Sequence, residues 1–202
     1  MTDLFRDKAS DWDARPTPTQ ISEGVFEALK VRVSLAPEMS VLDFGAGTGL
    51  LIEKIAPFVG RLLAVDVSQA MLEKLLTKPA LAGKVEVFCQ DILERPLGQH
   101  ADLAVSAMAM HHVKDTHALA TALFDHLKPG GRIALADLDT EDGSFHPAQV
   151  EGVFHQGFDR SSLGRILSDA GFADVDFGTA CVVEKEDRRY PVFLVTATKP
   201  AS

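Results

Sequence analysis

The sequence has little cysteine, little basic charge and no long apolar run. Its two cysteines, Cys89 and Cys181, lie in apolar, strand-like contexts and form no C-x-x-C pair. We therefore expect buried free thiols rather than a disulfide framework or a redox motif. No apolar stretch approaches the ~20 residues that span a bilayer, so we expect no membrane partner.

The start of the chain and its charge restrict the class of protein further. Residues 1–7 contain no basic segment followed by an apolar one, so they do not predict a secretory signal, and a cytoplasmic protein is the default expectation. The formal net charge is −9. Because a negative field opposes phosphate-rich partners, we expect no nucleic-acid substrate.

What is present is an alternation of apolar β-like runs and helical patterns, in a length of 202 residues that suits one domain. This alternation predicts a parallel sheet with helices on both faces. Ser68, Asp115 and Asp159 are candidate N-caps. Strands are expected at 41–44, 61–66, 84–88, 101–106 and 131–137, and helices at 50–57, 69–77, 116–127 and 160–170.

The C-terminal part departs from this alternation. Two β-rich runs, 173–183 and 190–198, are joined by a short charged segment, 184–189, which we interpret as a solvated tip. With no helix between them, the two runs should pair as an antiparallel hairpin. The Lys-Pro-Gly-Gly sequence at 128–131 is expected to end a helix and turn the chain into the next strand.

Two less regular segments flank this pattern. Residues 1–36 look like one or two helices interrupted at 15–18 by Arg-Pro-Thr-Pro, and residues 138–158 are rich in Asp, Gly, His and Phe. Both are candidate walls of a substrate pocket, because ligands of open parallel sheets bind beyond the carboxyl ends of the strands. The alternative is a packing helix and a surface loop.

A glycine-rich turn is the most informative motif. The apolar run at 41–44 leads into Gly45, Gly47 and Gly49, and a helical pattern begins at Leu50. Glycine accepts positive φ and lets a backbone lie against a ligand. The dinucleotide pattern G-x-G-x-x-G would require glycine at position 50, so Leu50 argues against an NAD enzyme. Asp43 completes the pattern D-x-G-x-G-x-G.

This pattern resembles the nucleotide-binding signature of class I methyltransferases that use S-adenosylmethionine. The resemblance covers residues 41–137 and implies a doubly wound α/β fold, with a mostly parallel seven-stranded sheet, helices on both faces and an antiparallel C-terminal β-hairpin. The implied organisation is a single domain over 1–202, with a helical lid at 1–36, a cofactor-binding core at 41–137, a pocket insertion at 138–158 and a C-terminal helix with hairpin at 159–202.

Further cofactor residues follow successive strands. Asp66, about 20 residues beyond the turn, is placed to accept hydrogen bonds from ribose hydroxyls, with Val67 against the adenine. The resemblance implies that Asp91 accepts from the adenine amino group and that Ile92 packs on the ring. Small residues at the end of 101–106 would admit the sulfonium. The expected cofactor-binding set is Asp43, Gly45, Ala46, Gly47, Gly49, Asp66, Val67, Asp91, Ile92 and Ser106.

The chemistry requires few catalytic groups, because the methyl group of S-adenosylmethionine is already activated. Alignment of the reactants supplies about 7–11 kcal/mol, against about 3–5 for a general base. Histidine is the natural base at neutral pH. The candidates are His111, His112, His146 and His155, with Asp137 and Asp139 to orient an imidazole or hold an amine, although both aspartates could simply cap loop backbone. We rank His111, His146, His155 and Asp137 as catalytic candidates.

The predicted function is transfer of a methyl group to a small-molecule O, S or N nucleophile, leaving S-adenosylhomocysteine. No metal is expected, because the histidine spacing matches no ligand run such as H-E-x-x-H. The alternative is a non-catalytic S-adenosylmethionine-binding regulatory or scaffold protein. The acceptor is open, and either a monomer or a homodimer is compatible with the sequence.

Overall fold

A seven-stranded sheet forms the centre of the molecule in the computed structural model, which describes residues 3–146 and 151–201. The strand order is β3-β2-β1-β4-β5-β7-β6. The first five are parallel, and β7 runs antiparallel to both β5 and β6. The predicted doubly wound fold with an antiparallel end is therefore confirmed. The strands are β1 (Ser40–Phe44), β2 (Arg61–Asp66), β3 (Val85–Cys89), β4 (Ala101–Ala107), β5 (Leu127–Leu138), β6 (Ala173–Lys185) and β7 (Arg188–Thr198).

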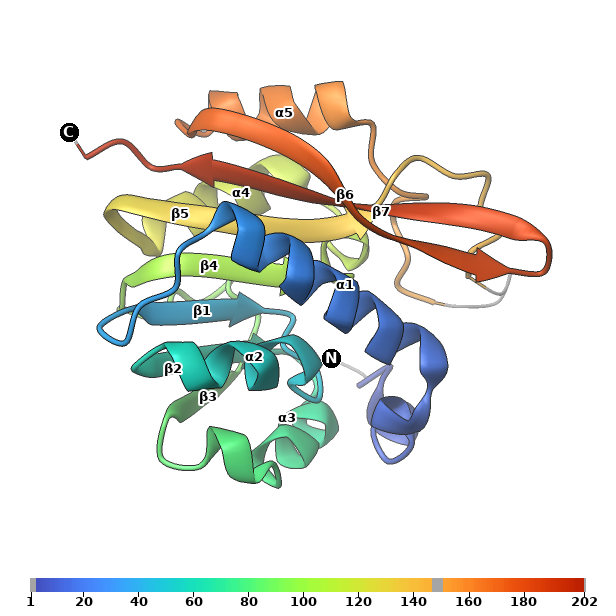
Figure 1. The fold of residues 1–202 in the computed structure, drawn as a ribbon, viewed down its shortest axis with the longest axis horizontal. Helices are drawn as coiled ribbons and strands as arrows, with labels where there is room; N and C mark the ends of the chain where they lie inside the picture. Colours follow the sequence, from blue (N-terminus) through green and yellow to red (C-terminus); the bar gives the residue numbers. More distant parts are fainter. Residues whose placement is uncertain (1–2, 147–150, 202) are drawn as a thin grey trace.

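Helices cover both faces of the sheet (Figure 1). The side chains of Val41 and Leu42, neighbours on β1, belong to two different apolar clusters, as expected for a strand buried on both sides. Helices α1, α2 and α3 contribute to the first cluster, and α4 and α5 to the second. The helices are α1 (Pro16–Arg32), α2 (Leu50–Ile55), α3 (Gln69–Leu76), α4 (Thr116–Asp125) and α5 (Arg160–Asp169).

The expected N-caps are present. Ser68, Asp115 and Asp159 each accept a hydrogen bond from a backbone N–H three residues later, at the starts of α3, α4 and α5. These caps fix where each helix begins after its preceding strand or loop. None of the helices in the described ranges has the length and apolarity needed to cross a membrane.

Three local expectations were wrong. Pro16 does not interrupt a helix but occupies the first position of α1, where its missing N–H costs nothing. The segment 128–131 lies inside β5, because Gly130 and Gly131 exchange backbone hydrogen bonds with Lys199. The hairpin tip is shorter than 184–189, since β6 and β7 pair as far as Lys185 and Arg188.

The cysteines were also misjudged. Both are free, but Cys89 is exposed and Cys181 is only partly buried. Their strands, β3 and β6, are the two edges of the sheet. An edge strand has a partner on one side only, so an apolar, strand-like context there does not ensure burial.

The parallel strands end along one rim. The arrowheads of β1, β4 and β5 point to the same side of the molecule, where the N-terminal segment also lies (Figure 1). A Cβ built on Gly45, after β1, would lie 2.2 Å from the Cβ of Ala109, after β4. The loops that follow these two strands are therefore in direct contact.

Candidate active site

The glycine turn has the backbone conformation that its sequence requires. Gly45, Gly47 and Gly49 have φ values of +68°, +54° and +81°. A side chain at Gly45 would meet Ala109, and one at Gly49 would meet Leu75. A Cβ at Gly47 would have nothing within 4 Å, so of the three glycines in the turn this one faces open space. Gly45 and Gly49 thus permit close packing, whereas the backbone at Gly47 is left uncovered.

Asp66 connects the glycine turn to the end of β2. Its carboxylate accepts hydrogen bonds from the backbone N–H groups of Gly47 and Ser68, both at 2.8 Å. Burial raises the pKa of this carboxyl, and the two N–H donors oppose that rise. Each carboxylate oxygen retains a further lone pair, so Asp66 can still accept from a ligand hydroxyl.

Asp43 lies deeper, on β1, and is 2% exposed. Burial, and then the nearby Asp66 carboxylate, raise the pKa of Asp43 well above its usual range. Two carboxyl groups thus share a region of low dielectric. A ligand that brings positive charge or hydrogen-bond donors would favour their ionised forms.

The other expected cofactor residues have different surroundings. Ala46 is buried in the turn, and its N–H donates to the carbonyl of Val65. Val67 is 51% exposed, whereas Ile92 is buried. Asp91 accepts from the N–H of Leu93 at 2.8 Å, within its own turn. The buried Ser106 hydroxyl donates to the Phe44 carbonyl at 2.7 Å, joining β4 to β1 rather than facing outward.

A histidine–aspartate pair lies at the ends of β4 and β5. The Nδ1 atom of His111 is 2.8 Å from Oδ1 of Asp137, and the His111 backbone N–H donates to Oδ2 of the same carboxylate at 3.1 Å. Both side chains are almost completely buried. Because a carboxylate can only accept, Nδ1 of His111 carries a proton, and in the neutral imidazole Nε2 then carries a lone pair. That Nε2 is buried without a hydrogen-bond partner among the described residues.

Two further imidazoles adjoin His111. The ring centroids of His112 and His146 lie 4.2 Å and 4.9 Å from that of His111. Burial, followed by the neighbouring histidines, lowers the pKa of His146 to about 4, and burial and His111 do the same for His112. Both are therefore neutral at pH 7. The described residues contain no group of three or more His, Cys, Asp or Glu side chains placed to hold a metal ion.

His155 and Asp139 do not join this cluster. Nε2 of His155 donates to the carbonyl of Val113 at 2.9 Å, which ties residues 151–158 to the loop after β4. Asp139 forms a bidentate pair with Arg160, both oxygens at 2.7 Å, and so joins the end of β5 to α5. Of the four catalytic candidates, the structure brings together His111, His146 and Asp137. Residues 147–150, within the expected pocket insertion, lie outside the described residues.

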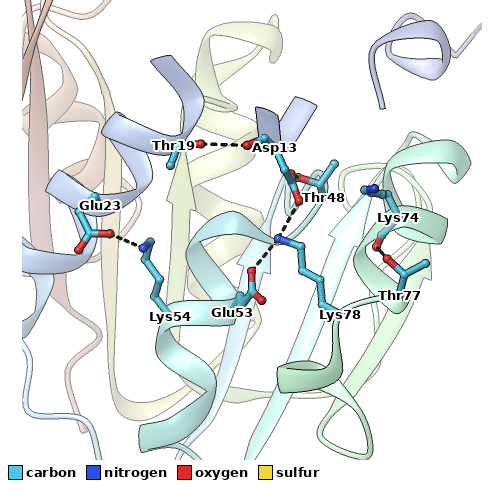
Figure 2. A network of polar contacts seen from close by, with 9 residues as sticks. All are labelled: Asp13, Thr19, Glu23, Thr48, Glu53, Lys54, Lys74, Thr77 and Lys78. Atoms are coloured by element: carbon cyan, nitrogen blue, oxygen red, sulfur yellow. Dashed lines mark hydrogen bonds and ion pairs between the residues drawn. The ribbon is translucent and has the colours of Figure 1, made fainter. Parts of the chain in front are cut away.

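The N-terminal segment lies over the cofactor loops, and sequence reasoning did not single out the contacts that hold it. Asp13 accepts from the hydroxyl of Thr48, inside the glycine turn, and pairs with Lys78 at 3.1 Å, while Lys78 also pairs with Glu53 at 2.8 Å (Figure 2). These contacts join residues 25 or more positions apart, so no local sequence pattern predicts them.

A second contact of this segment lies beside Asp66. Asp3 accepts from the Ser68 hydroxyl at 3.0 Å. Further along, the ring of Phe5 packs edge-on against His112, with centroids 5.2 Å apart. Residues 3–15 therefore span the rim from the ribose side of the expected cofactor site to the histidine cluster.

Comparisons with known proteins agree with this geometry. A methyltransferase domain family model matches residues 19–176. An uncharacterized methyltransferase of Schizosaccharomyces pombe is 32% identical over 68% of this chain and 55% of its own length. Phosphoethanolamine N-methyltransferase 1 of Arabidopsis thaliana is 28% identical over 77% of this chain and 33% of its own. This chain thus spans about half or less of these relatives.

A solved structure shares the fold. The N-methyltransferase NodS of Bradyrhizobium japonicum, determined with S-adenosylhomocysteine, superposes with a TM-score of 0.73 at 18% identity, covering 98% of this chain and 95% of that one. The family model covers well over half of the chain, and the S. pombe relative exceeds 30% identity. This chain belongs to the class I S-adenosylmethionine-dependent methyltransferases.

Proposed function

We propose that this chain transfers the methyl group of S-adenosylmethionine to a small-molecule O, S or N nucleophile, with His111 as general base and Asp137 as its positioning partner. The observation that carries the proposal is the contact between Gly45 and Ala109. It sets the glycine turn against the loop that bears His111. A cofactor on the turn would therefore present its reactive end near the unpaired Nε2 atom.

The cofactor would be held mainly on the β1–β2 side. In this assignment Gly47 presents its backbone, Asp66 accepts from the ribose, and Asp91 accepts from the adenine amino group with Val67 and Ile92 around the ring. Gly45, Ala46 and Gly49 shape the turn. Asp43 places a buried carboxyl beneath it, whose ionised form a cationic cofactor would favour, and Ser106 keeps β4 close to β1.

The residues on the β4–β5 side would handle the acceptor. When bound, S-adenosylmethionine supplies a methyl group activated by its sulfonium. His111 Nε2 takes the proton of the acceptor as the new bond to carbon forms and the carbon–sulfur bond breaks with its electrons passing to sulfur. Asp137 keeps the His111 tautomer that makes this possible and stabilises the imidazolium that results.

Two segments would close the site. We assign residues 3–15 as a lid over the cofactor, on the basis of the Asp13–Thr48 and Asp3–Ser68 hydrogen bonds. The segment after β5, which carries His146, would form the wall of the acceptor pocket, with His155 fixing its end to the loop after β4. The name of the Arabidopsis relative, a phosphoethanolamine methyltransferase, supports a small acceptor.

A methyl-transfer screen tests the proposal. The chain would be incubated with methyl-labelled S-adenosylmethionine and a panel of phenols, alcohols, thiols, amines and carboxylates, and formation of S-adenosylhomocysteine followed. Turnover of one acceptor class, abolished by heat and reduced in His111→Ala, is the expected result. Tight binding of S-adenosylhomocysteine with no turnover of any acceptor would instead favour a scaffold protein. If S-adenosylhomocysteine did not bind, neither a methyltransferase nor a scaffold protein that binds this cofactor would be supported.

A further inference from the structure

We propose that His111 and His146 hold the reacting oxygen of the acceptor between them, and that this pair selects a hydroxyl group over an amine, a thiol or a carboxylate. The inference rests on the proposed function and specifies the acceptor class that it leaves open. His146 is assigned as a second acceptor-binding residue beside the base.

The first observation is a pair of unsatisfied nitrogen atoms. Nε2 of His111 and Nε2 of His146 are both buried and lack a hydrogen-bond partner among the described residues. A buried polar atom left unpaired is destabilising, so two on adjacent rings point to a ligand that would satisfy them. The ring centroids are 4.9 Å apart and the planes are inclined by 40°.

The second observation is that each ring is held in place by other parts of the fold. Asp137 fixes His111 through Nδ1. Phe145 packs edge-on against His146 at 5.0 Å and against Tyr190 of β7 at 5.2 Å. Lys185 Nζ donates to the Phe145 carbonyl at 2.9 Å, so the C-terminal hairpin supports the position of His146. The two imidazoles are thus held beside each other by separate parts of the fold.

The hydrogen-bonding roles of the two atoms can be complementary. His111 offers a lone pair at Nε2, because its proton is used toward Asp137. His146 is neutral at pH 7, since its pKa lies at about 4, and carries one ring proton. A proton on Nε2 of His146 gives one donor beside one acceptor, whereas two facing lone pairs would repel each other. Two hydrogen bonds of about 2.9 Å through one shared atom can bridge such a pair.

Counting lone pairs then selects the acceptor. A hydroxyl oxygen donates its proton to His111, accepts from His146 with one lone pair and attacks the methyl group with the other. A neutral amine has a single lone pair, which cannot both accept from His146 and attack. A thiol is a weak donor and acceptor, and a carboxylate has no proton for His111 and would face the charge of Asp137.

The test compares three acceptors that differ only in the reacting atom: benzyl alcohol, benzylamine and benzyl mercaptan, with phenol, aniline and thiophenol as a second set. We expect the alcohol or phenol to be methylated with the highest kcat/KM. His146→Phe, which keeps an aromatic ring but removes the donor, should lower kcat/KM for the hydroxyl acceptor about tenfold and leave the affinity for S-adenosylhomocysteine within twofold. His146→Gln should restore part of the loss, and His117→Phe, at an exposed histidine of α4, is the matched control.

A preference for the amine, or an equal loss for all acceptors in His146→Phe, would overturn the inference while leaving methyl transfer in place. Failure to bind S-adenosylhomocysteine would instead overturn the proposed function. Nitrogen-15 NMR of the histidine rings gives a readout that needs no turnover. The expected tautomers are Nδ1–H for His111 and Nε2–H for His146, and the opposite tautomer at His146 would contradict the assignment.

Discussion

The two halves of the site are built differently. On the β1–β2 side the groups come from a continuous turn and from Asp66, and the hydrogen bond from Gly47 to Asp66 joins positions 19 apart. On the β4–β5 side the cluster combines His111, Asp137 and His146, from three separate segments. The groups on the β1–β2 side are largely backbone atoms, whereas those on the β4–β5 side are side chains. Changes on the first side should therefore affect cofactor binding, and changes on the second should affect turnover.

The largest expected effect is on the acceptor side. His111→Ala should lower kcat by about 10²–10⁴-fold, because the general base is lost, while the dissociation constant of S-adenosylhomocysteine stays within about twofold. Single-turnover kinetics and equilibrium dialysis measure the two quantities. His111→Asn, which can still donate to Asp137, is the control for structural damage. If this variant also lost affinity for S-adenosylhomocysteine, the two sides of the site would not be separate.

Asp66→Ala should show the reverse pattern. Removing the carboxylate would weaken cofactor binding by about 1.5–3 kcal/mol, since charge-assisted hydrogen bonds to the ribose and to the glycine turn are lost. At saturating cofactor the rate should recover. Asp176→Ala, at an exposed ion pair with Arg32, is the matched control. Unchanged affinity in Asp66→Ala would remove this residue from the site.

Two glycines of one turn should respond differently. Gly47→Ala places a methyl group in open space and should weaken cofactor binding more than it lowers stability. Gly49→Ala would meet the Leu75 side chain at 2.9 Å and should chiefly lower the free energy of unfolding. Both share a cost of about 1–2 kcal/mol for positive φ, so the comparison isolates the ligand contact. Urea denaturation and cofactor titration of both variants would show it, and identical profiles would contradict it.

Stability should depend on pH through His112 and His146. Both have a pKa of about 4 in the folded protein, below the usual 6.5, so the unfolded chain binds more protons between these values. The free energy of unfolding should therefore fall as pH is lowered from about 6.5 toward 4, and the histidine contribution should be fully present above 6.5. His146→Gln should flatten this dependence in urea titrations at several pH values. An unchanged slope would place His146 in solvent.

The smallest expected effect concerns the lid. Asp13→Asn removes the charge that pairs with Lys78 while keeping an acceptor for Thr48. Because partly exposed ion pairs contribute about 0–1 kcal/mol, we expect a severalfold faster release of cofactor and little change in stability. Stopped-flow displacement measures this rate, with Asp11→Asn, which pairs only within its own segment, as the control. Equal rates of cofactor release in Asp13→Asn and Asp11→Asn would show that the Asp13–Lys78 pair does not hold the lid closed.

The same contrast explains what the sequence could reveal. The positions of most strands and helices and the turn from Asp43 to Gly49 follow local patterns of apolar residues, glycines and helix caps, which act over a few residues. The pairing of His111 with Asp137 depends on two adjacent strand ends, so sequence could offer the residues but not the bond. Asp13 and Thr48, 35 residues apart, had no signal of their own. The exposure of Cys89 could be foreseen only from the strand order, which places β3 at an edge of the sheet.

We expect the glycine turn and Asp66 to form a cofactor site separate from the histidine cluster. Calorimetric titration with S-adenosylhomocysteine, carried out in parallel on the unmodified chain, Asp66→Ala and His111→Ala, tests it most directly. We predict saturable one-to-one binding by the unmodified chain and by His111→Ala with nearly equal affinity, and much weaker binding by Asp66→Ala. No binding by the unmodified chain, or equal weakening in both variants, would contradict the account.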